Sequence, residues 1–149
     1  VIPTRETVVY LDLPEAVELP PLIDYSRVPV PGTTALARSG VAGFALGSPG
    51  DGLKAGLHHA GPVTDPTDDP GPEETIAAWA AEWARSRYPA AGDVLGTDTC
   101  LYTNTADESF VLERRGRIVV GSACSGHGFK FAPQIGRTLA ALAREAAGF

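Results

Sequence analysis

The chain has 149 residues, a length typical of one domain that buries about 70% of its unfolded surface. Its formal net charge of -6 argues against nucleic-acid binding, because a phosphate backbone is bound by clustered lysine and arginine. No apolar run approaches the roughly 20 residues that cross a membrane, and two cysteines make no disulfide framework. We therefore expect residues 1–149 to form a single soluble unit in a reducing, cytoplasmic setting.

The first part of the chain is predicted to form strands. Residues 6–13 combine β-branched and aromatic side chains, which suit a pleated surface. Five prolines within residues 14–31 indicate irregular or edge structure around a short strand at residues 25–28. Residues 41–48 and 51–60 are separated by turn residues, so an antiparallel pair is expected there.

A helix is predicted over about residues 72–87. Asp69 is a candidate N-cap, followed by Pro70 at the first helical position, and Pro89 stops the helix. Apolar residues recur at helical spacing: Ile76, Trp79, Ala80, Trp83 and Ala84. Core packing is the expected role of both tryptophans.

The second part of the chain repeats this alternation of strand and helix. Three strands are predicted, over residues 97–105, 109–115 and 117–124. A turn at Arg115 and Gly116 makes the last two a hairpin. A loop over residues 125–131 leads to a closing helix that begins at Pro133 and ends at Gly148. The expected fold class is α+β, a mostly antiparallel sheet covered by helices.

The distribution of basic residues is uneven. Only Lys54 and Lys130 are lysines, whereas the other ten basic residues are arginine, and all three histidines lie in the same two glycine-rich stretches. An ammonium is a compact charge whose pKa shifts readily, while a guanidinium is a planar fork that stays charged. The pattern favours a chemical role for both lysines, with chance survival of two lysines as the alternative.

Several familiar site types do not fit. Residues 121–128 have the glycine spacing of a P-loop, but His127 replaces its lysine and Gly128 its hydroxyl residue. The cysteines and histidines lack the short paired spacing of a zinc site, so no metal is expected. A Ser125 nucleophile with His127 as its base lacks the usual strand-turn-helix elbow.

A strand-loop-helix unit remains at residues 117–148. Gly126 and Gly128 let the backbone approach a ligand closely, and the following helix offers unpaired N–H groups at its start. Lys130 lies at that entrance, where a ligand carboxylate or a reduced cofactor ring would be favoured. The alternative is a capped helix with a solvated lysine.

Three motifs then carry a family resemblance. CLYTNTADESFVLER (100–114) and SGHGFKFAP (125–133) resemble the C-terminal part of the monomeric sarcosine oxidase and N-methyltryptophan oxidase family, and GLKAGLHHAG (52–61) is similar to its lysine-bearing strand. The resemblance covers almost the whole chain. It implies the substrate-domain portion of a flavin amine oxidase, without the N-terminal Rossmann FAD domain.

The resemblance implies roles for individual residues. Cys100 matches the cysteine that holds FAD covalently, although a small buried hydrophobe is the usual fate of a lone cysteine. Lys54 matches the lysine above the flavin that promotes reaction with oxygen, and His58 a histidine near the substrate amine. By the two-residue strand period, His59 should point away from His58.

The resemblance also implies a substrate site and a cofactor-binding loop. Lys130 matches the residue that binds the substrate carboxylate, and Tyr102 a tyrosine of the substrate pocket. His127 lies against the flavin, with Gly126 and Gly128 in the same loop. A further tyrosine that relatives carry before the lysine strand is replaced by Ala42 or Gly43.

The expected function is oxidation of a secondary or N-methyl amino acid to an imine, with O₂ reduced to H₂O₂. The expected partners are a small amine or amino-acid substrate, O₂, and an N-terminal FAD-binding part in the same or a second chain; no nucleic acid or membrane is expected. The chain alone is expected to be incomplete and inactive. The alternatives are a non-catalytic amino-acid-binding module and an inactive half-protein without FAD.

Overall fold

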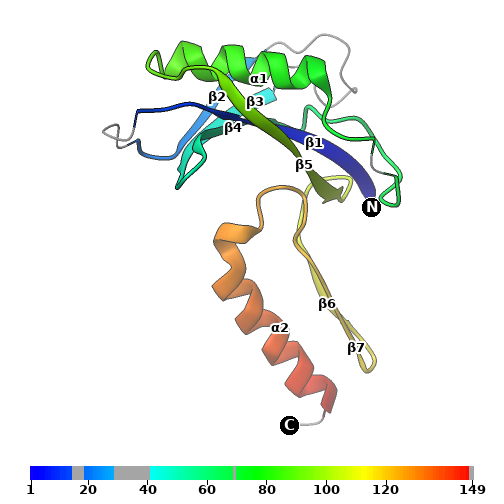
Figure 1. The fold of residues 1–149 in the computed structure, drawn as a ribbon. Helices are drawn as coiled ribbons and strands as arrows, with labels where there is room; N and C mark the ends of the chain where they lie inside the picture. Colours follow the sequence, from blue (N-terminus) through cyan, green and yellow to red (C-terminus); the bar gives the residue numbers. More distant parts are fainter. Residues whose placement is uncertain (15–18, 29–40, 69, 148–149) are drawn as a thin grey trace. The chain divides into compact units, whose positions relative to one another are not determined.

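The computed structural model describes residues 1–14, 19–28, 41–68 and 70–147 (Figure 1). Contacts within the chain form two compact units. The first unit is Pro3–Leu101, and the second is Tyr102–Phe149 together with Val1–Ile2. The expectation of a single domain stays a prediction.

The first unit contains a five-stranded sheet. Its strands are β1 (Ile2–Leu11), β2 (Leu22–Val28), β3 (Val41–Ser48), β4 (Gly52–His58) and β5 (Val94–Asn104), in the spatial order β2-β3-β4-β1-β5. Strand β1 begins one residue before this unit, and β5 ends three residues after it. Strand β4 lies antiparallel to both β1 and β3, and β3 lies antiparallel to β2. The predicted α+β class with an antiparallel sheet is confirmed.

The predicted pairing of the two central strands is also confirmed. Ser48 of β3 lies opposite Gly52 of β4, and the residues between them form the turn. Gly50 has a φ of 87°, a left-handed conformation that glycine adopts without steric cost. The Ser48 hydroxyl donates a hydrogen bond of 3.1 Å to Asp51 Oδ2. This turn fixes the register that later decides which β4 side chains share a face.

Helix α1 (Glu74–Arg87) begins two residues later than the predicted start at residue 72. Glu73 is its N-cap with an extended backbone, and Gly71 before it has a φ of 82°, which is incompatible with a helix. The Glu73 N–H donates to the Thr7 hydroxyl of β1 at 2.9 Å. A contact to a distant strand therefore sets the helix start, while the candidate cap Asp69 lies outside the described residues.

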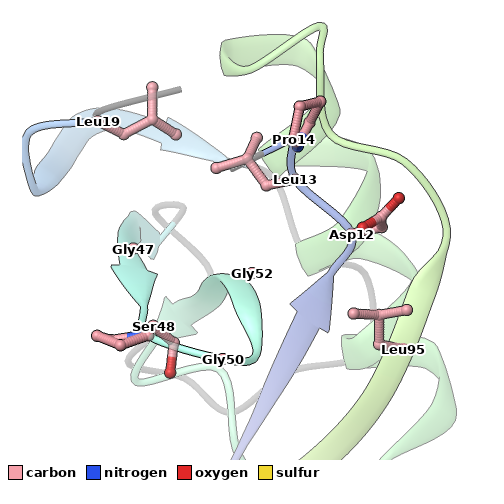
Figure 2. A pocket seen from close by; sticks show the side chains of 10 residues that line it. Asp12, Leu13, Pro14, Leu19, Gly47, Ser48, Gly50, Gly52 and Leu95 are labelled. Carbon is pink, nitrogen blue, oxygen red and sulfur yellow. The ribbon is translucent and has the colours of Figure 1, made fainter. Parts of the chain in front are cut away.

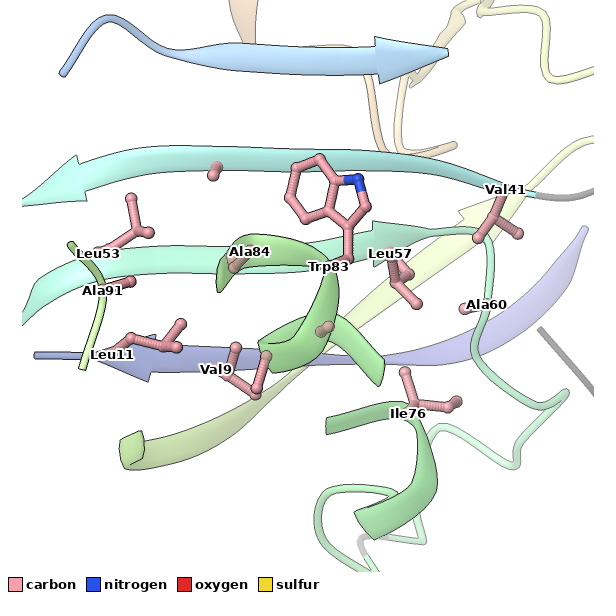
Figure 3. Close-up of a cluster of buried hydrophobic side chains, with 14 residues drawn as sticks. Val9, Leu11, Val41, Leu53, Leu57, Ala60, Ile76, Trp83, Ala84 and Ala91 are labelled. Atoms are coloured by element: carbon pink, nitrogen blue, oxygen red, sulfur yellow. The ribbon is translucent and has the colours of Figure 1, made fainter. Parts of the chain in front are cut away.

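Helix α1 packs on one face of the sheet and forms the core of the first unit (Figure 3). Leu11, Leu53 and Leu57 are almost completely buried beneath it. Trp83 is also buried, and its indole Nε1 donates to Asp24 Oδ2 at 3.3 Å. Trp79 is half-buried against the same cluster. The core role expected of both tryptophans is confirmed.

The second unit combines a hairpin with a helix. Its elements are β6 (Val111–Arg115), β7 (Ile118–Ser122), the 3-10 turn η2 (Phe129–Phe131) and α2 (Ala132–Ala147). The predicted hairpin is confirmed, and Gly116 in its turn has a φ of 63°. Helix α2 packs on both strands, and a side chain at Gly121 would collide with Leu139. The predicted helix end at Gly148 lies outside the described residues.

Within the described ranges, no helix has the length and apolar character needed to span a membrane.

Candidate functional site

Lys54 lies in the middle of β4, on the sheet face opposite α1. Its neighbours Leu53 and Ala55 point into the core and are completely buried, so the strand period turns Lys54 to the other side. We call this second side the site face. Lys54 is half-buried, and its Nζ lies 5.6 Å from the centre of the Tyr10 ring on β1. A cation over an aromatic face is stabilised by the ring quadrupole.

His58 lies on the same site face, four residues further along β4. Four residues of strand span about 13 Å, so Lys54 and His58 share a face without touching. Gly56 lies between them, and a side chain there would come within 2.7 Å of Phe44 Cζ. The Phe44 ring therefore covers the space between the two residues.

The alternation of side chains ends at His58. His59 lies just beyond β4 and has a φ of 61°, so it does not continue the strand. The ring centroids of His58 and His59 are only 4.0 Å apart. The expectation that His59 points away from His58 is wrong, because the left-handed turn replaces the extended backbone on which it rests.

Cys100 lies on β5, the strand at one edge of the sheet. It is an exposed, free cysteine. Partial burial of its sulfur raises the pKa of the thiol, while the Lys54 ammonium lowers it and the Glu6 and Asp98 carboxylates raise it further. Lys54 and Cys100 are thus close enough to interact electrostatically. Together with His58, they are the predicted catalytic and cofactor-binding residues that lie in the first unit.

The other predicted site residues belong to the second unit. Tyr102 is buried near the end of β5. His127 Nε2 lies 3.1 Å from the Glu108 carbonyl oxygen, and the His127 ring stacks on Phe110 with centroids 5.1 Å apart. Lys130 is exposed within η2, with its Nζ 5.4 Å from the centre of the Phe131 ring. Lys130 therefore lies one turn before α2, at the helix entrance that its sequence position predicts.

The loop before α2 needs its two glycines for different reasons. Gly126 has a φ of 81°. A side chain at Gly128 would collide with the Ala123 carbonyl oxygen, so packing within the loop already accounts for this glycine. Ser125 is buried, and its hydroxyl accepts a hydrogen bond from the Thr105 N–H at 3.3 Å. The role of Gly126 and Gly128 toward a cofactor stays a prediction.

The first unit also contains a pocket. It has a volume of about 690 Å³ at the end of the sheet where β1 stops and β3 turns into β4 (Figure 2). Asp12, Ser48 and Leu95 are among its lining residues, and none of the described lining residues is a predicted site residue.

Comparison with known proteins identifies the family. A family model described as FAD dependent oxidoreductase matches residues 1–142. The chain belongs to this family. It is 33% identical over 136 residues to a probable sarcosine oxidase of Arabidopsis thaliana, covering 86% of this chain and 30% of the relative. It is 33% identical over 99 residues to an N-methyl-L-tryptophan oxidase of Salmonella dublin, covering 62% of this chain and 27% of the relative.

A third relative matches a shorter stretch. The chain is 51% identical over 45 residues to the human peroxisomal sarcosine oxidase, covering 28% of this chain and 12% of the relative. This FAD-dependent oxidoreductase chain thus spans about 30% of the length of the first relatives it matches. The family resemblance inferred from the sequence motifs is confirmed.

The chemistry of the donor set fits FAD. Cys100 presents an exposed thiol, and the positive charge of the half-buried Lys54 is within electrostatic reach of it. A flavin carries negative charge when reduced, so a cation in a partly dry site suits it. Among the described residues, no three histidine, cysteine or acidic side chains converge as a metal site.

Sequence reasoning missed three residues of the FAD-dependent oxidoreductase chain that shape the site face. Tyr10 lies under Lys54, Phe44 covers Gly56, and Glu6 is buried on the same side of β1. No sequence signal marks Glu6 as buried, because it lies among the polar residues Thr4, Arg5 and Thr7 and carboxylates are rarely buried. The other two become visible only through the strand register.

Proposed function

We propose that the chain forms the substrate-domain portion of an FAD-dependent oxidase of secondary or N-methyl amino acids. The amine is oxidised to an imine, and O₂ is reduced to H₂O₂. The observation that carries the proposal is the placement of the half-buried Lys54 on the same sheet face as His58 and within electrostatic reach of Cys100. The names of the relatives, a sarcosine oxidase and an N-methyltryptophan oxidase, support this substrate class.

Lys54 is proposed to promote the reaction with oxygen. FAD, when bound, supplies the redox chemistry, taking two electrons from the amine and delivering them to O₂. The first electron that reaches O₂ makes an anion, which a fixed ammonium stabilises. The attraction is about four times stronger at an effective dielectric near 20 than in water, so the partial burial of Lys54 matters as much as its charge.

Cys100 is proposed to hold FAD covalently. Its exposed position on an edge strand gives a large ring system access to the sulfur without disturbing the core. The raised pKa keeps most of the thiol protonated at neutral pH, and the Lys54 ammonium opposes this shift. Lys54 therefore supports thiolate formation as well as the oxygen reaction.

The remaining predicted residues are proposed to bind substrate and cofactor. His58 lies at the substrate amine, Lys130 pairs with the substrate carboxylate, and Tyr102 lines the pocket. The ammonium of Lys130 is exposed on η2, where it is available to a carboxylate. His127, held by the Glu108 carbonyl and the Phe110 ring, is proposed to lie against the flavin together with Gly126 and Gly128.

The covalent link is tested in the protein expressed from its complete reading frame. After acid precipitation, we expect the yellow flavin to remain with the peptide that contains Cys100. The Cys100→Ser variant should release it, whereas Cys124→Ser, which changes the other exposed cysteine, should retain it. Flavin that washes free of the unmodified protein would contradict the covalent site.

The two lysines allow a matched test of the proposed division of roles. Stopped-flow measurements with an N-methyl amino acid should show that Lys54→Met slows reoxidation of the reduced flavin by O₂ by at least about 100-fold, the loss typical of one electrostatic group. Lys130→Met should instead weaken substrate binding and leave reoxidation unchanged. Equal reoxidation rates in the two variants would contradict the role of Lys54.

The FAD-binding part is proposed to come from the same or a second chain, in a cytoplasmic protein. If the complete protein is colourless yet binds N-methyl amino acids in calorimetry, the interpretation as a non-catalytic binding module is favoured over the oxidase.

A further inference from the structure

Glu6 is a buried carboxylate for which the proposed reaction has no use. It lies on β1, on the site face, and only 3% of it is exposed. Its Oε1 accepts a hydrogen bond of 2.7 Å from the Thr4 hydroxyl, and its Oε2 accepts one of 2.9 Å from the Gly61 N–H. A charged group that is buried this deeply is retained only where several donors satisfy it.

The donors of Glu6 come from the turn that follows β4. The left-handed turn at His59 brings the Gly61 N–H to the carboxylate, while the Ala60 N–H donates to the Leu57 carbonyl at 3.4 Å and also helps to lower the Glu6 pKa. Successive N–H groups around such a turn form a concavity that binds anions. Burial raises the pKa of Glu6, while Thr4, Gly61 and the nearby His59 lower it.

The same segment is held tightly against β1. A side chain at Gly61 would collide with the Arg5 carbonyl and come within 2.9 Å of the Glu6 nitrogen. The Arg5 N–H also donates to the Pro62 carbonyl at 3.0 Å, and Thr4 forms a bridge with Val63. The backbone of the turn therefore has little freedom to move relative to Glu6.

The turn determines where the His59 ring lies. With a φ of 61°, His59 leaves the strand direction, and its ring contacts that of His58 with centroids 4.0 Å apart and planes tilted by 58°. His58 is the last residue of β4, so along β4 itself strand neighbours precede it but none follows it. The His59 ring supplies contact on the other side.

We propose that Glu6 and His59 are positioning residues for His58. The buried Glu6 carboxylate fixes the left-handed turn, the turn places the His59 ring, and the His59 ring restricts the orientation of the His58 imidazole. The inference rests on the proposed role of His58 at the substrate amine. A misplaced reacting group can cost about 100-fold in rate, so holding one histidine ring with another has a measurable consequence.

Two variants separate positioning from folding. In Glu6→Gln the amide keeps the shape of the side chain, but its NH₂ group faces N–H groups of the turn. Two hydrogen-bond donors then face each other and cannot pair. In His59→Gly the left-handed turn remains favourable, because glycine adopts it without steric cost, but the ring is lost. The matched control is Glu73→Gln, which removes the ion pair with Arg5 on the opposite face of β1.

The readouts are the side-chain NMR signals of His58 and the kinetics of flavin reduction in the complete protein. The His58 signals are assigned by their loss in His58→Asn. Glu6→Gln and His59→Gly should both shift these signals and slow flavin reduction at saturating N-methyl amino acid by about tenfold or more. Glu73→Gln should do neither, and reoxidation by O₂ should be unchanged in all three variants.

The outcomes distinguish this inference from the proposed function. Unshifted His58 signals in His59→Gly would overturn the positioning role, even if Glu6→Gln failed to fold. If His58→Asn itself reduces the flavin at the normal rate, the proposed role of His58 fails. The NMR shifts would then still decide whether Glu6 and His59 orient its ring.

Discussion

Gly43 on β3 is a position of the first unit where one added methyl group is expected to disturb the packing of a core tryptophan. A Cβ built at Gly43 would lie 2.7 Å from Trp83 Cδ2 and closer still to two other atoms of the indole. Non-bonded carbons need about 3.5–4.0 Å, so the Trp83 ring must move by roughly 1 Å or more. That movement stretches the hydrogen bond from its Nε1 to Asp24, which is already 3.3 Å long.

The magnitude follows from these two effects. Overpacking of a core costs about 1–3 kcal/mol, and the weakened hydrogen bond adds about 1 kcal/mol. Alanine also restricts the unfolded chain, which returns roughly 0.5 kcal/mol. We expect Gly43→Ala to lower the free energy of unfolding by about 3 kcal/mol, with a fall in Tm of about 6–12 °C for a chain of this size.

Urea unfolding followed by far-UV circular dichroism measures this change. Gly47→Ala is the matched control, since the same substitution on the same strand meets nothing within 4 Å. Trp83→Leu creates space at the collision, so the double variant with Gly43→Ala should be more stable than the sum of the single effects implies. Equal urea midpoints for Gly43→Ala and Gly47→Ala, or additive effects with Trp83→Leu, would refute the reasoning.

Three other predictions concern the site face. Lys54→Met should raise the pKa of the Cys100 thiol further, because the ammonium now lowers it; the pH dependence of iodoacetamide alkylation in a Cys124→Ser background measures this, and an unchanged pKa counts against the interaction. Burial raises the pKa of Glu6 above its ordinary value of 4.5, so the native state holds this proton more tightly than the unfolded state. The stabilisation by this proton is complete below pH 4.5 and is lost as the pH rises through the native pKa. Glutamine does not titrate, so the stability of Glu6→Gln should rise relative to that of the unmodified protein over this pH range. A difference in the free energy of urea unfolding that stays constant with pH would contradict this prediction. Ala42 lies opposite His58, and Ala42→Tyr should leave the fold intact. One added hydrogen bond should change the Kd of an N-methyl amino acid by about threefold or more. An unaltered Kd would contradict this prediction.

The two residues expected in place of a family tyrosine lie on opposite faces of β3. Ala42 shares the face of His58, whereas Gly43 lies beneath Trp83 and has no room for a side chain. Sequence patterns could not separate these neighbours, because a shift of one residue reverses the face and the register of β3 depends on its partner strands. The turn between β3 and β4, by contrast, was predictable because proline, glycine and aspartate favour it locally.

Long-range contacts explain the remaining differences. The start of α1 depends on Thr7, 66 residues away from Glu73, so local capping signals placed it too early. The position of His59 depends on Glu6, which binds a turn 55 residues further along the chain. Lys54 and the core residues Leu53 and Ala55 lie on opposite faces of β4, an alternation that is a local property of a strand.

The alternation along β4 ties chemistry to folding in one element. Leu53, Ala55 and Leu57 are buried by the core, and Lys54 and His58 occupy the intervening positions. A slip of one residue against β1 or β3 would put the ammonium and an imidazole beneath α1 and turn the leucines outward. A misregistered chain would therefore lose its core and its reactive side chains together, so the fraction of chains that carry the site should equal the fraction that are correctly folded.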